Sequence, residues 1–284
     1  DGSVLKTCSA RSLLHQMAEA AWECADPGLQ FDTTINDWNT AANTSRITAS
    51  NPCSEYMHLD DSACNLASLN LLAFLADPAD GETHGFDVDG FCHAIEVVFT
   101  AQEILVGHAD YPTPAIAKTT RAFRQLGLGY ANLGAMLMAL GMPYDSEAGR
   151  SVASAITSLM TGYAYLTSAR MAEHLGPFDG FATNRGPTLA VLERHRAAAE
   201  MLDDGDTLDL VDAGRRAWSE ACELAERVGV RNSQATVLAP TGTIGLLMDC
   251  DTTGIEPDLS LVKTKRLVGG GTMSIVNRTV PRAL

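Results

Sequence analysis

Three functional groups alternate along one short segment of the chain. In Asn51-Pro52-Cys53-Ser54-Glu55, an amide, a thiol and a carboxylate occupy every second position. Residues i, i+2 and i+4 of an extended segment project to the same side, so we expect these three side chains to converge. The carboxylate could exchange a proton with a substrate hydroxyl, the amide could hold that hydroxyl or its carbonyl product, and the thiol could lose a hydrogen atom or a proton. The alternative is a plain loop in which Cys53 is a small buried hydrophobe and Asn51 serves a turn.

A second thiol follows shortly after this segment. Cys64 lies within Ser62-Ala63-Cys64-Asn65-Leu66, and it returns to the neighbourhood of Cys53 if the chain turns between them. Two thiols near one carboxylate indicate redox chemistry.

A Gly/Thr loop near the end of the chain is a candidate anion site. Residues 234–239 have strand character and run into Pro240-Thr241-Gly242-Thr243-Ile244, and the apolar residues 246–248 that follow are predicted as a helix. Backbone N–H groups at a helix start and the helix dipole favour an anion there, and Thr241 and Thr243 could add hydroxyl donors. An ordinary strand-to-helix connection is the alternative for such a loop taken alone.

The composition is that of a globular protein with a sizeable core. The chain has 284 residues, of which 46% are hydrophobic, and a formal net charge of -15 with scattered Lys and Arg. A nucleic-acid polymer is therefore not an expected partner. The sequence has neither the long apolar run of a membrane span nor the features of a signal peptide at residues 1–3, so the cytoplasm is the expected location.

The cysteines and histidines do not have the spacing of a metal site. The seven cysteines are spread along the chain without a CxxC pair, and HExxH does not occur, so reduced thiols and no metal are expected. Cys24 lies on a helical pattern with Trp22 and is expected in the core. The histidines His58, His93, His108, His174 and His195 have no ligand spacing, which favours core or solvated roles.

Helical and strand patterns alternate along the chain, which predicts an α/β fold. Apolar spacing predicts helices over 9–25, 91–105, 151–175 and 208–228, with Ser146 and Thr207 as N-caps. For residues 66–72 a strand is favoured over a short helix, which periodicity alone does not exclude, and 31–50 is predicted as a polar loop. The glycines of 126–134 do not have the spacing of a dinucleotide-binding motif, so they indicate close helix packing.

Several long motifs resemble one enzyme family. Residues 50–56, followed by 64–70, closely resemble the finger loop and following strand of adenosylcobalamin-dependent (class II) ribonucleotide reductases. Further matches are 33–36 with 38–40, 126–133, 143–146, 239–245 and 253–257. The resemblance extends from about residue 10 to the end of the chain.

The resemblance implies a fold and a domain. The fold would be α/β, part of a ten-stranded α/β barrel with a central finger loop that carries a radical cysteine. Residues 1–284 would be a partial catalytic barrel domain, with the finger loop at about 48–60 and the phosphate-binding loop at about 239–246. Roughly the first half of the barrel, a partner thiol, most of the specificity site and a C-terminal cysteine tail would be missing. The exposed strand edges of such a piece would need that missing part for stability.

The resemblance also implies the roles of the site residues. Cys53 would carry the thiyl radical that takes the 3'-hydrogen of the ribose, Glu55 would deprotonate the 3'-hydroxyl, and Asn51 would hydrogen-bond to the substrate. Cys64 would be one member of the reducing thiol pair. The residues of the substrate-phosphate site would be Pro240, Thr241, Gly242, Thr243 and Ile244.

The implied activity is the reduction of ribonucleotides to 2'-deoxyribonucleotides for DNA synthesis and repair. Its cofactor would be adenosylcobalamin, which rests wholly on the resemblance, and its reductant a thioredoxin-like protein or another dithiol. A homodimer is left open. Two alternatives remain: a class I large-subunit piece that uses a separate metal-containing radical subunit, or a truncated chain that binds nucleotide without turnover. The sequence around Cys53 and the short interval to Cys64 favour the cobalamin class.

Overall fold

The structure is a computed structural model that describes residues 2–76, 85–203, 205 and 209–284. The chain divides into two compact units, Asp1–Asp37 and Trp38–Leu284. Each unit is considered by itself.

The first unit contains two helices, α1 (Ala10–Cys24) and α2 (Asp32–Asp37). The predicted helix is confirmed, and Ser9 caps it by accepting from the Ser12 N–H. No residue of the described helix α1 is buried, so the expectation that Cys24 lies in the core is wrong. The amphipathic spacing is genuine, but within its own unit the helix has nothing to cover its apolar side. The prediction of a loop over 31–50 missed α2, which has an acidic residue in its first turn, where the helix dipole favours it.

The second unit is built on two parallel strands, β1 (Asn65–Asn70) and β2 (Leu126–Ala131). Their register runs from Asn65 opposite Leu126 to Asn70 opposite Ala131. Residues 234–237 lie beside β2 as a further extended segment, because Leu128 pairs with Thr236 in parallel and the Val237 N–H donates to the Leu128 carbonyl at 3.0 Å. The strand predicted near 66–72 is confirmed up to Asn70 as β1. The strand predicted over 234–239 pairs with β2 only through a single bridge at Thr236.

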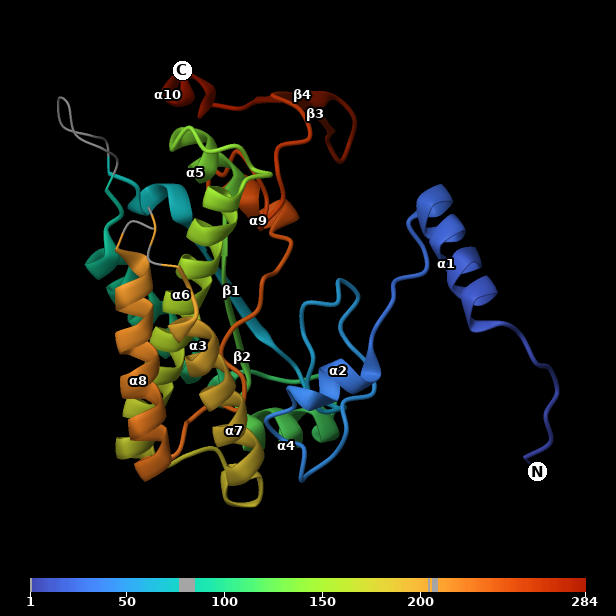
Figure 1. Ribbon diagram of the computed structural model, residues 1–284, viewed down its shortest axis with the longest axis vertical. Helices are drawn as coiled ribbons and strands as arrows, with labels where there is room; N and C mark the ends of the chain where they lie inside the picture. Colours follow the sequence, from blue (N-terminus) through green and yellow to red (C-terminus); the bar gives the residue numbers. More distant parts are fainter. Residues whose placement is uncertain (1, 77–84, 204, 206–208) are drawn as a thin grey trace. The chain divides into compact units, whose positions relative to one another are not determined.

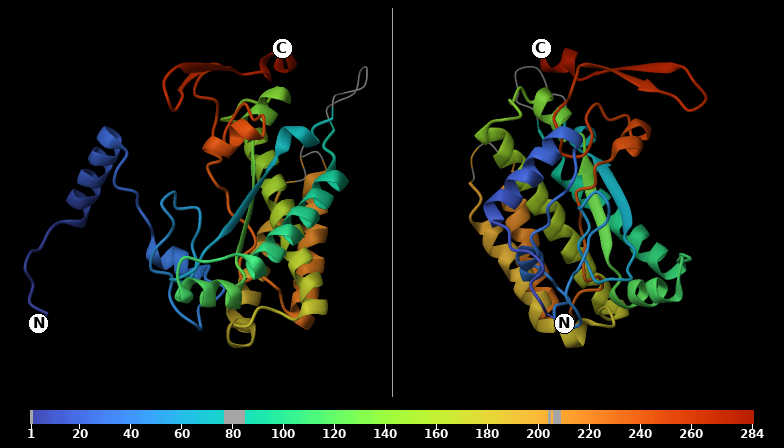
Figure 2. Two further views of the ribbon diagram at one scale, coloured as in Figure 1. Left: turned by 180° about the vertical axis from the view of Figure 1, so that it is seen from behind. Right: turned by 90° about the vertical axis from the view of Figure 1, so that its right-hand side faces the viewer.

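Helices connect the strands, as parallel pairing requires. They are α3 (Val88–His108), α4 (Pro114–Phe123), α5 (Leu133–Ala139), α6 (Glu147–Leu175), α7 (Phe181–Glu200) and α8 (Leu210–Val228). Figures 1 and 2 show α6 beside both α3 and α8, and α3 contacts β1 and β2. The three predicted helices of this region are therefore confirmed, whereas α4, α5 and α7 were not predicted.

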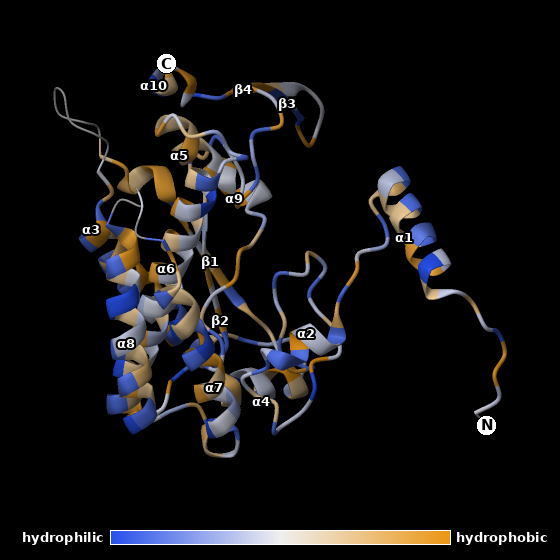
Figure 3. Ribbon diagram, in the orientation of Figure 1, coloured by the Kyte–Doolittle hydropathy of each residue, from blue (hydrophilic) through white to orange (hydrophobic). Residues whose placement is uncertain are grey.

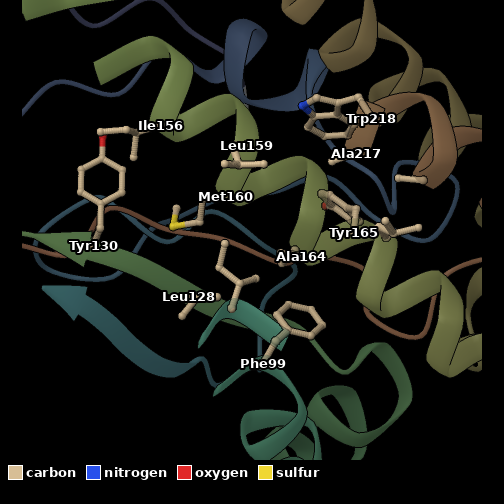
Figure 4. Packing of buried hydrophobic residues seen from close by; sticks show 14 of the residues in the cluster. Phe99, Leu128, Tyr130, Ile156, Leu159, Met160, Ala164, Tyr165, Ala217 and Trp218 are labelled. Atoms are coloured by element: carbon tan, nitrogen blue, oxygen red, sulfur yellow. The ribbon is translucent and has the colours of Figure 1, made fainter. Parts of the chain in front are cut away.

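The core lies between the strands and these helices. Leu128 and Tyr130 of β2 face Ile156 and Met160 of α6, and Phe99 of α3 closes the same cluster (Figure 4). The hydropathy colouring shows α8 with one apolar and one polar side (Figure 3), and its apolar residues Ala217, Trp218 and Ala221 are buried. This helix layer supports the strands from one side.

Two predicted N-caps have different outcomes. Ser146 caps α6 by accepting from the Gly149 N–H at 3.0 Å, as predicted. Thr207 lies outside the described residues, and the residue at the N-cap of α8 is Asp209.

Of the glycines of 126–134, Gly127 and Gly129 belong to β2 and Gly134 belongs to α5. The prediction of close approach is confirmed, but at Gly127 and Gly129 the element is a strand rather than a packed helix. A Cβ on Gly129 would lie 2.3 Å from the Val237 carbonyl oxygen, and one on Gly127 would lie 2.7 Å from Cys64 Sγ. Glycine is needed because backbone and side chains from neighbouring segments fill the space that a Cβ would occupy.

The remaining elements are short. They are the 3-10 helix η1 (Leu71–Phe74), α9 (Gly242–Leu247), the antiparallel pair β3 (Val262–Arg266) and β4 (Thr272–Val276), and α10 (Val280–Ala283). The predicted helix after the Gly/Thr loop is confirmed as α9. The described residues form a mixed helix and strand structure with two two-stranded sheets, and the ten-stranded barrel stays a prediction.

Among the described residues, α3 alone is long and apolar enough to cross a membrane by length and composition. It contacts β1, β2 and α6, and it buries Phe91, Ile95 and Phe99. Those contacts are typical of a core helix of a globular protein.

Candidate functional site

Residues 50–57 form a hairpin rather than an extended segment. Ser50 pairs with Met57 in antiparallel fashion, and the Ser54 N–H donates to the Asn51 carbonyl at 3.0 Å. The Asn51 Oδ1 atom closes the turn by accepting from the Tyr56 N–H at 2.9 Å. The expected extended geometry over 51–55 is therefore wrong, because an Asn that binds the backbone further on, followed by Pro, favours a turn.

The turn places the three predicted groups in different surroundings. Cys53 is exposed near the tip of the hairpin, whereas Asn51 and Glu55 are partly buried on its two sides. The Oε2 atom of Glu55 is buried, and no hydrogen-bond partner for it occurs among the described residues. A buried carboxylate oxygen without a partner is an acceptor for a donor that the chain itself does not supply.

Cys64 lies beside Glu55, at the start of β1. Burial and the nearby Glu55 carboxylate raise the pKa of the Cys64 thiol to about 12. Cys64 also packs against Tyr56, Val237 and Ala239. The structure thus brings together the predicted carboxylate and the second thiol, and it holds that thiol in its protonated form at neutral pH.

Buried polar side chains hold the backbone on both sides of Cys64. Thr120 Oγ1 accepts from the Ala63 N–H at 2.9 Å, and Gln125 Nε2 donates to the Ala63 carbonyl at 2.9 Å. On the other side, Gln102 Nε2 donates to the Asn65 carbonyl at 2.7 Å. None of these three polar residues was predicted from the sequence. The one signal for them in the sequence is a polar residue among apolar neighbours, and in the structure Gln102, Thr120 and Gln125 are all buried.

His58 anchors the base of the hairpin. Its Nε2 atom lies 2.8 Å from Ser233 Oγ, just before the extended segment 234–237. Complete burial lowers the pKa of His58 to about 3, so the ring is neutral. The expectation of a core or solvated role is confirmed as a core role.

The predicted phosphate loop begins directly after this cluster, because Ala239 packs with Tyr56 and Cys64 and the next residue is Pro240. Thr241 is buried, and its Oγ1 atom accepts from the Gly254 N–H at 2.6 Å. Gly242, Thr243 and Ile244 are exposed at the start of α9. The hydroxyl oxygen of Thr241 is therefore engaged inside the protein, whereas the Thr243 side chain faces outward.

No group of three or more potential metal ligands occurs in the part of the chain that the structure describes. The candidate site therefore consists of a carboxylate, thiols, an amide and a backbone loop. Together they can accept a hydroxyl proton, donate hydrogen from a thiol, and offer N–H groups to an anion.

Comparisons with known proteins identify a family and several relatives of this chain. The family profile described as "Ribonucleotide reductase, barrel domain" matches residues 1–284. Vitamin B12-dependent ribonucleotide reductase of Streptomyces coelicolor is 56% identical over 100% of this chain and 29% of its own length. The protein of the same name from Rhodopirellula baltica is 53% identical over 97% of this chain and 26% of its own length. Vitamin B12-dependent ribonucleoside-diphosphate reductase of Mycobacterium tuberculosis is 31% identical over 94% of this chain. The chain thus spans less than a third of the length of these relatives.

Proposed function

The chain belongs to the ribonucleotide reductase barrel-domain family, and from this premise we propose that it is part of an enzyme that reduces ribonucleotides to 2'-deoxyribonucleotides by thiyl-radical chemistry. The product would serve DNA synthesis and repair. The name shared by the most similar relatives reported above supports a vitamin B12-dependent enzyme.

One observation carries the proposal. The buried Glu55 Oε2 atom has no partner among the described residues, and it lies in a hairpin whose tip exposes Cys53 and whose base adjoins the protonated Cys64. A ribose hydroxyl is a donor that fits the unpaired carboxylate oxygen. The same ribose would lie between a thiol that can form a radical and a thiol that can deliver hydrogen.

The proposed roles follow from these positions. Cys53, as a thiyl radical, takes the 3'-hydrogen of the ribose while Glu55 accepts the 3'-hydroxyl proton. Asn51 holds the substrate through its amide. Cys64 and a partner thiol outside this chain each give one electron and one hydrogen: one hydrogen replaces the 2'-hydroxyl on the ribose, the other leaves with that hydroxyl as water, and the two thiols become a disulfide.

The substrate phosphate is proposed to bind the loop Pro240, Thr241, Gly242, Thr243 and Ile244. The exposed residues Gly242 to Ile244 open α9, whose first N–H groups have no helical acceptor. The proposal is supported by the cluster that Ala239 forms with Tyr56 and Val237, against which Cys64 packs.

The proposed cofactor is adenosylcobalamin. When bound, it supplies the radical that takes the thiol hydrogen of Cys53. The exposure of Cys53 at the hairpin tip fits this requirement, since the thiol must be reachable from outside the chain.

Further parts of the proposal concern the complete protein. Its fold would be the ten-stranded barrel with residues 48–60 as the finger loop, and its reductant a thioredoxin-like protein or another dithiol. A homodimer and a cytoplasmic location complete the proposal.

The test is deoxyribonucleotide formation by the full-length parent protein from a ribonucleotide mixture and dithiothreitol, with and without adenosylcobalamin. Product that depends on adenosylcobalamin supports the proposal. Activity only with a separate metal-containing subunit would move the enzyme to class I, and nucleotide binding without any product would favour a non-catalytic chain.

Cys53→Ser in the same protein should abolish product formation and leave nucleotide binding intact, because the hydroxyl O–H bond is too strong to replace the thiol. Cys8→Ser, at another exposed cysteine, is the matched control and should keep full activity. Turnover by Cys53→Ser would remove the radical assignment.

A further inference from the structure

Two asparagines at the carboxyl ends of β1 and β2 bind each other. Asn70 ends β1 and Asn132 follows β2, and Asn132 Nδ2 donates to Asn70 Oδ1 at 2.9 Å. Asn132 is fully buried. The pair lies at the carboxyl ends of β1 and β2, whereas Cys64 lies at the other end of β1, so Asn70 and Asn132 are separate from the redox residues.

The other side of the Asn132 amide binds a segment far along the chain. Its Oδ1 atom accepts from the backbone N–H groups of Asp251 and Thr252, each at 3.0 Å. The Thr252 hydroxyl in turn accepts from the Ala135 N–H, in the first turn of α5, at 3.1 Å. One buried amide therefore ties residues 251–252 to the ends of both strands.

The same connections hold α9 and the loop before it. Asn70 Nδ2 donates to the Met248 carbonyl at 3.1 Å, at the C-terminal end of α9. At the other end, the Gly254 N–H donates to Thr241 Oγ1. Gly242 has open space around its Cα, with nothing within 4 Å of a built Cβ. The loop is thus fixed at both ends while its outward side stays uncovered.

Asn132 has both an unusual backbone conformation and side-chain hydrogen bonds, and the two can be tested separately. Its φ of 71° lies in the left-handed region, which Asn tolerates better than most residues and Gly tolerates best. Gly at this position would keep the backbone conformation and remove the amide. The hydrogen bonds can therefore be tested without adding backbone strain.

We infer that Asn132 is a positioning residue that presets the Pro240–Ile244 loop for the phosphate groups of the substrate. The inference rests on the proposed function, since it names what holds the proposed phosphate loop. A loop that is already in its binding conformation loses little freedom when an anion binds, whereas a loosened loop must be ordered by the ligand. Loss of the amide should therefore weaken nucleotide binding more than it slows the chemistry at Glu55 and Cys64.

The experiment compares Asn132→Gly with the unaltered full-length protein. Equilibrium dialysis gives the Kd for cytidine diphosphate without any need for turnover, and steady-state assays give kcat and KM. We expect Kd and KM to rise at least about tenfold, as loss of two or more buried hydrogen bonds that order the loop would produce, while kcat changes by about twofold or less.

Asn184→Ala is the matched control. Asn184 is also fully buried, accepts from the Asn43 N–H at 2.9 Å and donates to Thr44 Oγ1 at 2.7 Å, but it lies on α7 and has no bond to the 241–254 region. Asn184→Ala should lower the thermal midpoint without raising Kd.

If Asn132→Gly does not fold, Asn70→Asp is the second variant. It keeps the acceptor for Asn132 and removes the donor to Met248, and it should also raise Kd.

An unchanged Kd in folded Asn132→Gly or Asn70→Asp would overturn the inference, as would an equal rise in the Asn184→Ala control. Failure of the proposed function looks different. A full-length protein that makes no deoxyribonucleotide but binds cytidine diphosphate more weakly after Asn132→Gly would refute the activity and support the positioning role. A full-length protein that binds neither cytidine diphosphate nor cytidine triphosphate would refute both.

Discussion

At the scale of single residues, Glu55 and Cys64 have to be understood together. The thiol is buried and the neighbouring carboxylate is negative, and both disfavour the thiolate. A protonated thiol is the form that can deliver hydrogen to a substrate. The carboxylate thus has two effects at the site, one on a substrate hydroxyl and one on the protonation of Cys64.

Glu55→Gln should speed the alkylation of Cys64 by iodoacetamide at pH 8 to 9. Removing the negative charge lowers the pKa of Cys64 from about 12, although burial, the larger cause, keeps the pKa above 9. Peptide mass spectrometry of the full-length protein measures the rate. Cys92, whose pKa of about 11 has burial and Asp89 as its causes, is the internal control and should not change. An unchanged Cys64 rate would show that the carboxylate does not act on this thiol.

His58 makes the base of the hairpin sensitive to acid. Its pKa falls from 6.5 in the unfolded chain to about 3 in the folded protein, so the unfolded state binds the proton first as the pH decreases. The stability that it contributes is therefore complete above about pH 6.5 and is lost progressively down to pH 3. Between pH 7 and pH 5 this loss is about 2 kcal/mol.

His58→Gln should remove this dependence, because an amide does not titrate in this range and can still bond Ser233. Hydrogen exchange of the Ser233 amide, at pH 7 and pH 5 and corrected for intrinsic rates, gives the local opening free energy. His15→Gln, at an exposed histidine, should behave as the unaltered protein does. Equal pH dependence in His58→Gln and the unaltered protein would contradict the buried neutral state.

At the scale of elements, the contact between β2 and the segment 234–237 decides where the phosphate loop begins. Gly127 and Gly129 allow that contact, since a side chain at either position would occupy space filled by Cys64, Leu66 or Val237. The loop follows the segment directly, so its position depends on how closely 234–237 approaches β2.

Gly129→Ala should loosen the segment. The new methyl group would lie 2.3 Å from the Val237 carbonyl oxygen, which is backbone and cannot move without breaking the pairing with β2. Overpacking of this kind costs about 1–3 kcal/mol. Hydrogen exchange of the Val237 amide, which donates to the Leu128 carbonyl, should become faster.

Gly186→Ala is the control for this substitution. Gly186 lies inside α7, and apart from its chain neighbours nothing lies within 4 Å of a built Cβ. Because the next residue is Pro187, any effect of alanine on stability is local to α7, and the exchange of the Val237 amide should not change. If Val237 exchanges at the same rate in Gly129→Ala as in the unaltered protein, the close approach at β2 is not required.

At the scale of the second unit, one buried carboxylate joins segments from distant parts of the chain. Glu103 of α3 accepts from Arg124 Nε at 2.6 Å, from Arg231 Nε at 2.7 Å and from Asn232 Nδ2 at 2.7 Å. Arg124 follows α4, and residues 231–232 lead to the extended segment 234–237. The network therefore connects the helix layer to the strand that precedes the phosphate loop.

Glu103→Ala should destabilise the protein by about 3–5 kcal/mol, because it leaves two largely buried guanidinium groups without their counter-charge. The thermal midpoint of the full-length protein measures the effect. Glu193→Ala removes an exposed ion pair with Arg196 and should cost about 1 kcal/mol or less. A similar midpoint in both variants would mean that the Glu103 network does not hold the segments together.

Local patterns were the part of the fold that could be predicted. The spacing of apolar residues located α3, α6 and α8, and Ser146 was recognised as a cap because its side chain bonds only three residues ahead. The helix α7 was missed because Gly186 and Pro187 interrupt its pattern, although the fold accommodates both. The prediction for 126–134 identified the close approach but not the strand, because a glycine indicates a nearby neighbour without showing which element provides it.

The sequence by itself determined which functional groups are present and which family they resemble. Asn51, Cys53, Glu55, Cys64 and the 240–244 loop were all identified from residue types and short spacings. Only the tertiary structure decided that 51–55 is a turn, that the Glu55 carboxylate lies beside Cys64, and that Asn132 holds a segment near Thr252. The physical reason is that these contacts join residues whose distance in space depends on the path of the whole chain, whereas a local pattern reports only on neighbours along the sequence.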